Sequence, residues 1–540
     1  MKKTLTLFLA LILTMSCCSF AAAEEAPTTV SIALALNTNV VDYDTNAYTL
    51  ALEKEFNVDI DFLLLEDIDQ KLPVMVSSGS ALPDMICCAL NNNMIWNWAQ
   101  QGVLAPLKQY WDNPELTTHL MSRVADLRCD PALVDEMLAN CIMPDGEIYT
   151  LPSYDQNLWN LMPYRMRVNT QWLEQAGLEI PTTLDAFREM LVYFRDHDMN
   201  GNGDAADEIP LTGSSLTWGG SIEAFLLGSF IHANPSANYM NVENGRITPA
   251  YTQDAFREGL AYLHDMYAEG LIDPLCFTQD QTQMKAVING DELLVGAVCC
   301  GSNSNFTTPE TDAAYSIIAP LTGPNGVACA ASSPASSIGK VYITCDAKDP
   351  ELCFRMAEIN YASRWRALFA CGVEGENWTS DPEEIRQLKL TFSSGDYDRV
   401  LYAKTENIWG KVNNNIWNSE CMPFFTTMEN IINMVEVGKK VSDLTEEELN
   451  AISPEERHYT LYKDHQPAEM PGTLLYTSEE LEKLADIQAA IDSYAKEQIM
   501  AFIVGNQSLD GWDAFQAELR KMGLEDYVSI MQAAYDRKTA

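Results

Sequence analysis

The richest concentration of potential metal ligands lies between residues 196 and 210. Oxygen-bearing side chains recur at every second position there, at Asp196, Asp198, Asn200, Asn202 and Asp204. Gly201 and Gly203 allow tight backbone turns between them, and Asp207 and Glu208 follow. Ca²⁺ takes about 6–8 oxygen ligands, which one short loop can supply. The segment therefore predicts a structural calcium site.

The residues alone do not determine which positions of this loop would hold the ion. Counting from Asp196 puts Gly201 at the sixth EF-hand position and Asp207 at the twelfth. An aspartate at the last position has a shorter arm than the usual glutamate, which makes bidentate closure harder. A solvated acidic turn without an ion is the alternative to any calcium site.

The element that would hold this loop is a helix over residues 182–196. Thr182 and Asp185 are spaced as a capping box after a proline. Apolar residues follow at helical spacing, namely Leu184, Phe187, Met190, Leu191 and Phe194. The loop is thus expected to begin where a core-facing helix ends.

The N-terminal part alternates strand-like and helix-like segments. The strands are expected at Thr28–Leu36, Val58–Leu65 and Met85–Leu90, with helices around Tyr48–Phe56 and Asp69–Ser78. This alternation with nearly continuous apolar strands predicts an α/β fold with a parallel sheet. Ligands bind beyond the carboxyl ends of such strands. Asn91 and Asn92 follow the third strand, so we expect them in the binding crevice.

Bulk properties narrow the class of protein further. A chain of 540 residues is too long for one core and predicts at least two lobes. The balance of 34 Lys and Arg against 77 Asp and Glu repels nucleic acid and anionic membrane surfaces. Capping and periodicity predict a mostly helical C-terminal third, with a capping box at Thr477 and Glu480.

The first residues read as an export signal. Lys2 and Lys3 precede an apolar stretch, and three alanines ending at Ala23 offer a cleavage site. Cleavage after Ala23 would remove residues 1–23. Lipid attachment at Cys17 or Cys18 is the alternative, although the residues before Cys17 form a poor lipobox. The mature protein is expected outside the cell or on its surface.

Several segments, in order along the chain, resemble one known family. They are Lys71–Asp84, Asp145–Pro152, Val168–Leu184, Tyr267–Asp280, Gly372–Trp378 and Leu509–Tyr527. Together they resemble the extracellular solute-binding proteins of bacterial ABC importers. Within this family the chain is most similar to the calcium-loop branch, which includes the alginate-binding proteins and the LplA/LipO-type lipoproteins.

The resemblance implies a type II periplasmic-binding-protein-like fold, with two α/β lobes, a hinge and a helical C-terminal part. Residues 28–160 with about 325–395 are expected in the first lobe. Residues 161–324 with about 396–540 are expected in the second lobe, which carries the calcium loop. The implied role is capture of a carbohydrate, an oligosaccharide in particular, and its delivery to ABC permease subunits. No catalytic activity and no nucleic-acid partner are expected, and the protein is expected to be a monomer.

The same resemblance favours a second register for the calcium loop. In the family's commonest form three ligands two residues apart precede a paired Asp-Glu. The corresponding ligands here are Asp198, Asn200, Asn202, Asp204 through a carbonyl, Asp207 and Glu208. One extra residue before Asp207 departs from that form, at the point where the Asp204 carbonyl would contribute.

Tryptophans in polar loops are the candidates for carbohydrate contact. Sugar rings present C–H faces to aromatic side chains, while their hydroxyls pair with Asn, Asp, Gln and Arg. The candidates are Trp159, Trp218, Trp378 and Trp409, together with Asn91 and Asn92. For each tryptophan alone a packing role is at least as compatible with its context. Peptide or small charged ligands on the same fold, a dockerin-like module and a glycoside hydrolase are the competing functions.

Overall fold

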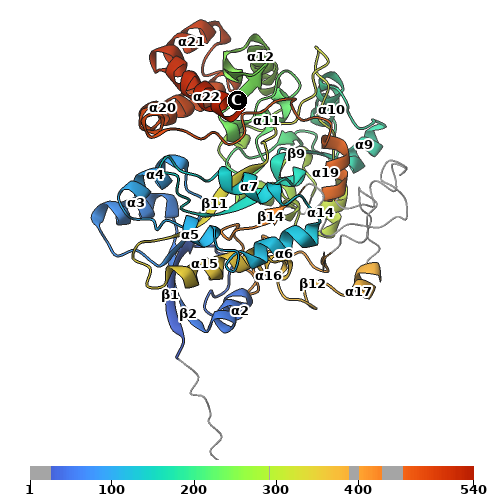
Figure 1. Ribbon diagram of the computed structural model, residues 1–540. Coiled ribbons are helices and arrows are strands. Elements are labelled where there is room, and N and C mark those ends of the chain that lie inside the picture. Colours follow the sequence, from blue (N-terminus) through green and yellow to red (C-terminus); the bar gives the residue numbers. More distant parts are fainter. Residues whose placement is uncertain (1–25, 291, 388–400, 428–453, 540) are drawn as a thin grey trace, which may run out of the picture.

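The computed structural model describes residues 26–290, 292–387, 401–427 and 454–539 (Figure 1). Two separate sheets, of six and four strands, form the centres of two lobes. The expected signal segment, with Cys17 and Cys18, lies outside the described residues. Within the described residues no helix is long and apolar enough to cross a membrane.

The first sheet has the strand order β14-β4-β11-β3-β1-β2. Its strands are β1 (Thr28–Ala35), β2 (Val58–Leu65), β3 (Met85–Cys87), β4 (Leu151–Asp155), β11 (Ser336–Ile343) and β14 (Phe425–Thr426). Strand β11 is antiparallel to both of its neighbours, and every other pair is parallel. The carboxyl ends of the five remaining strands therefore meet at one edge.

Helices cover both faces of this sheet (Figure 1). They are α2 (Ala47–Phe56), α3 (Ile68–Ser78), α4 (Asn92–Gln100), α5 (Lys108–Trp111), α6 (Thr118–Leu127), α7 (Ala132–Ala139), α15 (Pro350–Glu358) and α16 (Ser363–Cys371). The core between them includes Tyr48, Trp417 and Phe425. Tyr48 and Trp417 meet edge to face with ring centroids 4.9 Å apart.

The assignment of residues from about 396 onward to the second lobe is wrong for residues 401–427. Strand β14 pairs with β4 in the first sheet, and Trp417 is fully buried in the core of that sheet. These contacts join residues more than 250 positions apart in the chain, so no local pattern announces them.

The second sheet has the order β10-β5-β9-β6. Its strands are β5 (Met166–Asn169), β6 (Ile209–Thr212), β9 (Val295–Cys299) and β10 (Tyr315–Ile317). Strand β5 is antiparallel to β9 and β10, and β6 is parallel to β9. The carboxyl ends of β6, β9 and β10 and the amino end of β5 thus share an edge.

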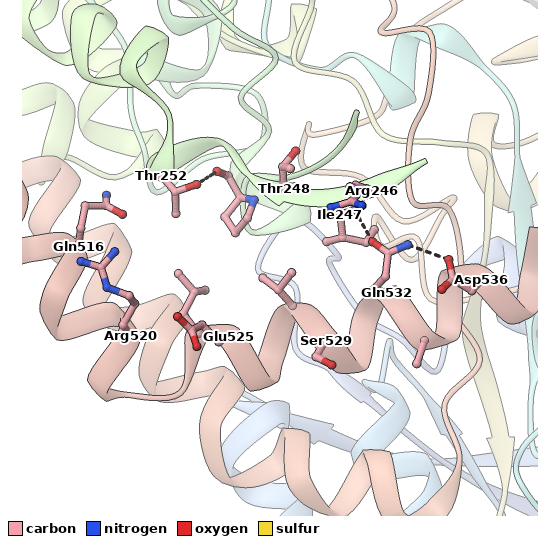
Figure 2. A pocket seen from close by; sticks show the side chains of 14 residues that line it. Arg246, Ile247, Thr248, Thr252, Gln516, Arg520, Glu525, Ser529, Gln532 and Asp536 are labelled. Atoms are coloured by element: carbon pink, nitrogen blue, oxygen red, sulfur yellow. Dashed lines mark hydrogen bonds between the residues drawn. The ribbon is translucent and has the colours of Figure 1, made fainter. Parts of the chain in front are cut away.

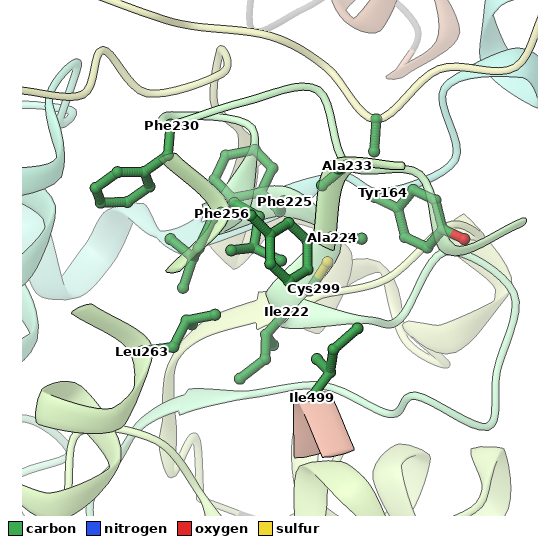
Figure 3. Packing of buried hydrophobic residues seen from close by; sticks show 14 of the residues in the cluster. Tyr164, Ile222, Ala224, Phe225, Phe230, Ala233, Phe256, Leu263, Cys299 and Ile499 are labelled. Carbon is green, nitrogen blue, oxygen red and sulfur yellow. The ribbon is translucent and has the colours of Figure 1, made fainter. Parts of the chain in front are cut away.

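Helices and a hairpin surround the second sheet. They are α8 (Leu158–Leu161), α9 (Thr170–Ala176), α10 (Leu184–Asp196), α11 (Ile222–Leu227), the hairpin β7 (Met240–Glu243) and β8 (Arg246–Pro249), α12 (Asp254–Ala268), α13 (Gln281–Ile288) and α14 (Pro309–Ala314). Three long C-terminal helices and α19 add to this lobe, namely α19 (Pro454–Tyr462), α20 (Ser478–Ile503), α21 (Trp512–Lys521) and α22 (Leu524–Thr539). Figure 3 shows Ile499 of α20 among Phe225, Phe256 and Cys299 in the shared core.

Two helices begin at or next to the residues where their capping patterns predict a start. Helix α20 begins with the expected capping box of Thr477 and Glu480. Helix α10 is capped by Thr183, whose hydroxyl accepts from the amide of Ala186, rather than by Thr182. The five expected core residues of α10 are all buried, so its register is as predicted although its cap is one residue later.

Within the described residues the chain passes between the two sheets at the edges where the carboxyl ends of most strands lie. It leaves β4 for β5 through residues 156–165 and returns from β10 to β11 through residues 318–335. After β14 it reaches α19, where Arg457 Nε donates to the carbonyl of Ile317 at 3.0 Å. The carboxyl-end edges of both sheets therefore face each other across the hinge, as expected for a binding crevice.

The candidate ligand cleft and the acidic loop

The first hinge passage and the loop after β6 bring Trp159 and Trp218 to one buried arginine. Arg165, fully buried, lies between them, with its Cζ 3.4 Å from the Trp159 ring centroid and 5.2 Å from that of Trp218. The close contact with Trp159 is desolvated and contributes about 2 kcal/mol, whereas the longer contact with the half-exposed Trp218 contributes about 0.5 kcal/mol. Trp218 remains 48% exposed, so part of its ring is open to a ligand.

The position of Arg165 is fixed by backbone carbonyls. Its Nη1 donates to the carbonyls of Trp159 at 2.7 Å and Met162 at 2.9 Å, and its Nη2 donates to Gly301 at 2.5 Å. Because these partners come from the hinge and from the loop after β9, the guanidinium ties three segments together. Its charge is thereby directed at the protein rather than at a ligand.

The loop carrying Trp218 depends on a glycine. Gly219 has φ +68°, and a Cβ there would lie 2.2 Å from the carbonyl oxygen of Pro163 and 2.7 Å from Cα of Gly301. The amide of Gly301 donates to the carbonyl of Trp218 at 3.2 Å. Close approach of three backbones, which only glycine permits, therefore sets the direction of the Trp218 ring.

Polar groups of the first lobe lie beside the hinge. Asp155, at the end of β4, accepts from Thr426 Oγ1 at 2.6 Å, from Asn160 Nδ2 at 2.6 Å and from the amide of Asn157 at 2.8 Å. Burial raises the pKa of Asp155, and these hydrogen bonds oppose the rise. Its acceptor capacity is therefore largely used within the protein.

A buried histidine of α19 also contacts Trp159. The ring of His458 meets Trp159 edge to face at 5.4 Å, and its Nε2 is 3.1 Å from the carbonyl of Met162. Burial, reinforced by the charge of Arg165, lowers the pKa of His458 well below its ordinary value. The imidazole is thus neutral and acts as a wall for the tryptophan.

Trp409 approaches the second lobe from the first. The amide of the following residue, Gly410, donates to Asn418 Oδ1 at 2.8 Å. A Cβ at Gly410 would lie 2.9 Å from Oγ of Ser304, which belongs to the loop after β9. The same loop carries Asn303, which accepts from the buried Arg167. The structure thus brings Trp159, Trp218 and the Trp409 segment around residues 301–305.

Asn91 and Asn92 lie at the same edge but farther along it. They precede and begin α4, immediately after β3, and Asn91 Oδ1 accepts from the amide of Met94 at 2.9 Å as a helix cap. With Asn93 they line a pocket of about 360 Å³ whose other wall is α20. The sequence therefore places them correctly at a strand end, although part of Asn91 serves the helix.

Trp378 does not belong with the other candidates. It is 2% exposed, it packs against Tyr402, and its indole N–H donates to the carbonyl of Gly372 at 2.5 Å. Both its face and its donor are used inside the first lobe, so we remove it from the candidate site. Polar neighbours in the sequence suggested a ligand loop, but they form a turn over a buried ring.

Sequence reasoning missed Arg165, Asp155 and Asn303. An arginine six residues after Trp159, in an otherwise apolar hinge segment, was the only local signal for Arg165. Its stacking with Trp218, 53 positions away, depends entirely on tertiary contacts.

A larger groove lies outside the crevice. It has a volume of about 750 Å³ and is formed by β8 and the helices α21 and α22 (Figure 2). Arg246 and Arg520 lie toward its two ends. Gln532 accepts from the amide of Ile247 at 2.7 Å and donates to the carbonyl of Gly245 at 3.0 Å. All of its lining residues belong to the second lobe, so closure of the lobes cannot enclose a ligand there.

The acidic loop joins α10 to the amino end of β6, away from the crevice edge. Asp198 accepts from the amides of Gly201 at 2.7 Å, Asn202 at 3.1 Å and Gly203 at 2.8 Å. Gly201 and Gly203 both have positive φ and open space around their Cα atoms. The loop is therefore folded around Asp198 by local hydrogen bonds.

The remaining acidic side chains converge on the same turn. Asn202 Nδ2 donates to Asp207 Oδ2 at 2.7 Å and to Glu292 Oε2 at 2.9 Å. Glu208 Oε1 accepts from the amide of Met199 at 2.7 Å, while its Oε2 is enclosed without a hydrogen-bond partner. Glu292 was not anticipated, because it reaches the loop from 90 residues away.

The described residues contain no group of three or more His, Cys, Asp or Glu side chains arranged to hold a metal ion. A calcium site in the loop would therefore also need asparagine and backbone oxygens. Asp196 does not turn into the loop, since it pairs with Arg195 at 2.8 Å. This geometry disfavours the register that begins at Asp196.

Residues 42–361 match the family described as bacterial extracellular solute-binding protein. The match covers more than half of the chain and spans both sheets. The chain belongs to this family. Membership agrees with the fold, in which two lobes face each other across a hinge.

One known relative is similar to this solute-binding protein over nearly its whole length, and a second over about a third of it. The chain is 26% identical over 517 residues to the fructooligosaccharide ABC transporter substrate-binding protein FusA of Streptococcus pneumoniae, covering 91% of this chain and 86% of FusA. It is 27% identical over 198 residues to the lipoprotein LipO of Bacillus subtilis, covering 36% and 38% of the two chains.

Solved structures share the fold. FusA of S. pneumoniae in complex with kestose superimposes with a TM-score of 0.74 at 22% identity, covering 95% of this chain and 99% of that one. The alginate-binding protein AlgQ2 without calcium ion gives 0.67 at 18% identity, with coverage of 95% and 98%. These likenesses confirm the expected type II two-lobe architecture.

Proposed function

We propose that this solute-binding protein captures a neutral oligosaccharide between its lobes and delivers it to ABC permease subunits. The observation that carries the proposal is the stack of Trp159, Arg165 and Trp218 at the facing edge of the second sheet. A half-exposed indole held rigidly by a buried cation offers a flat apolar face, which suits the C–H face of a sugar ring.

The charges around this stack favour an uncharged ligand over a peptide or a charged solute. Arg165 directs three N–H donors to backbone carbonyls, and Asp155 accepts three hydrogen bonds from the protein. Neither group offers a free ionic partner. A ligand with many hydroxyls and no net charge would meet the remaining amides and the exposed indole without leaving a buried charge unpaired.

The comparisons support a carbohydrate. FusA is described as binding fructooligosaccharide, and its solved structures hold kestose and fructo-nystose. A related structure is a solute-binding protein for HMO from Bifidobacterium longum infantis. The strongly acidic balance of the chain argues against a polyanionic sugar such as alginate. Capture and release need no catalytic step, and we infer a binding protein rather than an enzyme.

We infer a structural Ca²⁺ in the acidic loop. The orphaned Oε2 of Glu208 fits this assignment, because a cation would supply the missing partner of an enclosed carboxylate oxygen. The proposed ligands are Asp198, Asn200, Asn202, the Asp204 segment, Asp207 and Glu208, with Glu292 beside them. An EF-hand mutant among the FusA structures is in keeping with such a loop in a relative.

The proposed location is the cell exterior. The family is extracellular, and LipO is a lipoprotein, which supports the export signal and leaves Cys17 or Cys18 as lipid attachment points. We expect a monomer, since capture requires only the two lobes of one chain. Mass spectrometry of the protein isolated from its host would distinguish a lipid-modified N-terminus from one cut after Ala23.

Calorimetry with the purified mature protein tests the function. Titration with neutral fructo-, malto- and cello-oligosaccharides should give binding with at least one series, and peptides of mixed sequence should give none. Trp218→Ala should weaken binding without lowering stability. Leu216→Ala is a matched control, because Leu216 is 67% exposed in the same loop. Binding of peptides alone would overturn the proposal.

A further inference from the structure

A second polar pocket lies at the facing edges, separate from the tryptophan stack. Asn91, Asn92 and Asn93 form its wall in the first lobe, and one face of α20 forms the opposite wall. Its volume is about 360 Å³. Most of α20 packs in the core of the second lobe, while Leu481 at its start packs with residues of the first lobe. The pocket therefore lies where the two lobes meet.

Each wall carries an acceptor oxygen that lacks a donor. Oδ1 of Asn93 and Oδ1 of Asp492 are both enclosed and accept no hydrogen bond within the described residues, although the Asp492 carboxyl group as a whole is hydrogen-bonded by Gln488 and Tyr527. Leaving a buried acceptor unmatched costs about 1–3 kcal/mol. Two such atoms on opposite walls of one cavity indicate that a ligand with donor groups belongs between them.

The rest of the lining fits a sugar unit. Tyr476 supplies an aromatic ring, Gln488 supplies a planar amide, and Ala485 and Ala489 leave room on the helix face. Aromatic faces with planar polar side chains are the groups that hold a pyranose or furanose ring. Asn93 and Asp492 would accept from its hydroxyls.

The pocket also lies within reach of the tryptophan stack. Strand β3 leads into Asn91–Asn93 and β4 leads into the hinge with Trp159, and only β11 separates these two strands. Cys87 at the end of β3 and Leu151 at the start of β4 both pair with Val341 of β11. The end of β4 at Asp155 therefore lies two strand spacings, about 10 Å, across the sheet and four residues, about 13 Å, farther along it, a span that several linked sugar units cover. One extended oligosaccharide can therefore occupy both places.

We propose that the pocket of Asn93, Tyr476 and Asp492 is a second sugar subsite, which makes the protein selective for oligosaccharides over single sugars. This inference rests on the proposed function, because it assumes a carbohydrate at the tryptophan stack. The hydroxyl-rich unit bound here also bridges the two lobes, so ligand length is coupled to closure.

The test compares ligands of increasing length on the full mature protein. Ladders from monosaccharide to hexasaccharide of the fructo-, malto- and cello- series are titrated by calorimetry. Ala489→Phe should fill the pocket. The gain in affinity from the shortest to the longest ligand should then be about tenfold smaller than in the wild type, as expected for two lost hydrogen bonds. Asn93→Ala should reduce the same gain. The shortest ligand that binds should keep its wild-type affinity in both variants.

Ala490→Phe is the matched control, because Ala490 is exposed on α20 and does not line the pocket. Circular dichroism melts confirm that each variant is folded. If the affinity of both pocket variants rises with ligand length as much as that of the wild type, the subsite is overturned and the proposed function stands. Absence of binding by the wild type to every ladder overturns the proposed function, and the subsite with it.

Discussion

The two ends of strand β6 differ in how they are built. At its amino end, the acidic loop is folded mainly by hydrogen bonds between residues at most nine apart, centred on Asp198 and Glu208, with one contact to the distant Glu292. At its carboxyl end, the loop with Trp218 is held by Pro163, Arg165 and Gly301 from distant segments. The first end is a local structure that stabilises one lobe, and the second is a tertiary structure that presents a ring to the cleft.

The largest expected effect comes from adding one methyl group at the cleft end. Gly219→Ala should lower the free energy of unfolding by about 3 kcal/mol or more, because strain at positive φ adds to a clash with backbone. Gly203→Ala, at the loop end, has positive φ but open space and should cost only about 1 kcal/mol. Urea denaturation of both variants measures the difference, and equal losses would contradict the comparison.

Calcium should act on the loop end alone. After EDTA treatment, Ca²⁺ at 100 times its dissociation constant should stabilise the protein by about 2.7 kcal/mol, seen as a higher melting temperature. Glu208→Gln should lose most of that gain. Oligosaccharide affinity at a temperature where the protein stays folded should be unchanged by Ca²⁺. An unchanged melting temperature in the wild type would mean that the loop is a solvated acidic turn.

Trp218→Ala, at the cleft end, should weaken ligand binding and leave stability nearly unchanged. Because the ring is already half exposed, its removal should cost about 1–2 kcal/mol of ligand affinity, which is roughly tenfold. The free energy of unfolding should change by no more than about 0.5 kcal/mol. Calorimetric titration and denaturation of the same sample separate the two quantities, and Leu216→Ala should alter neither.

The smallest expected effect is a change of stability with pH, and it distinguishes an acidic group in the loop from one beside the cleft. Asp198 in the loop has its carboxylate oxygens paired with backbone amides, whereas burial raises the pKa of Asp492 beside the cleft to about 6, with Lys496 opposing the rise. The folded state then holds this proton more tightly than the unfolded state. Stability from this group is therefore present below about pH 4 and lost as pH rises through about 6.

The Asp492→Asn variant should consequently be more stable than the wild type at pH 7, by about 1 kcal/mol after allowance for partial solvent screening. The two proteins should converge at low pH. Denaturation curves across this pH range provide the measurement, and a constant difference at every pH would exclude the titration of Asp492 as the cause.

Much of the fold was predictable because its signals are local. The strands β1 and β2 and the helices α10 and α20 follow from apolar periodicity and from caps within a few residues. Asn91 and Asn92 were correctly expected at a strand end, since parallel topology alone puts them there. The acidic loop was recognisable because its oxygen-bearing side chains are spaced along one short stretch.

The candidate site was predicted less well, because the environment of a side chain depends on distant segments. Trp218 and Trp378 both lie in polar sequence contexts, yet one is half exposed and the other is 2% exposed. Trp378 is covered by Tyr402, and its N–H is taken by Gly372. Nothing in the neighbouring residues of either tryptophan distinguishes these outcomes.

The sequence by itself determined the α/β class, the family and the acidic loop, because each depends on spacing within a segment. Only the tertiary structure decided that residues 401–427 join the first sheet, that Arg165 lies between two tryptophans, and that Asn93 faces Asp492. The physical reason is that backbone pairing, ring stacking and cavity walls form between segments whose separation along the chain carries no periodic signal.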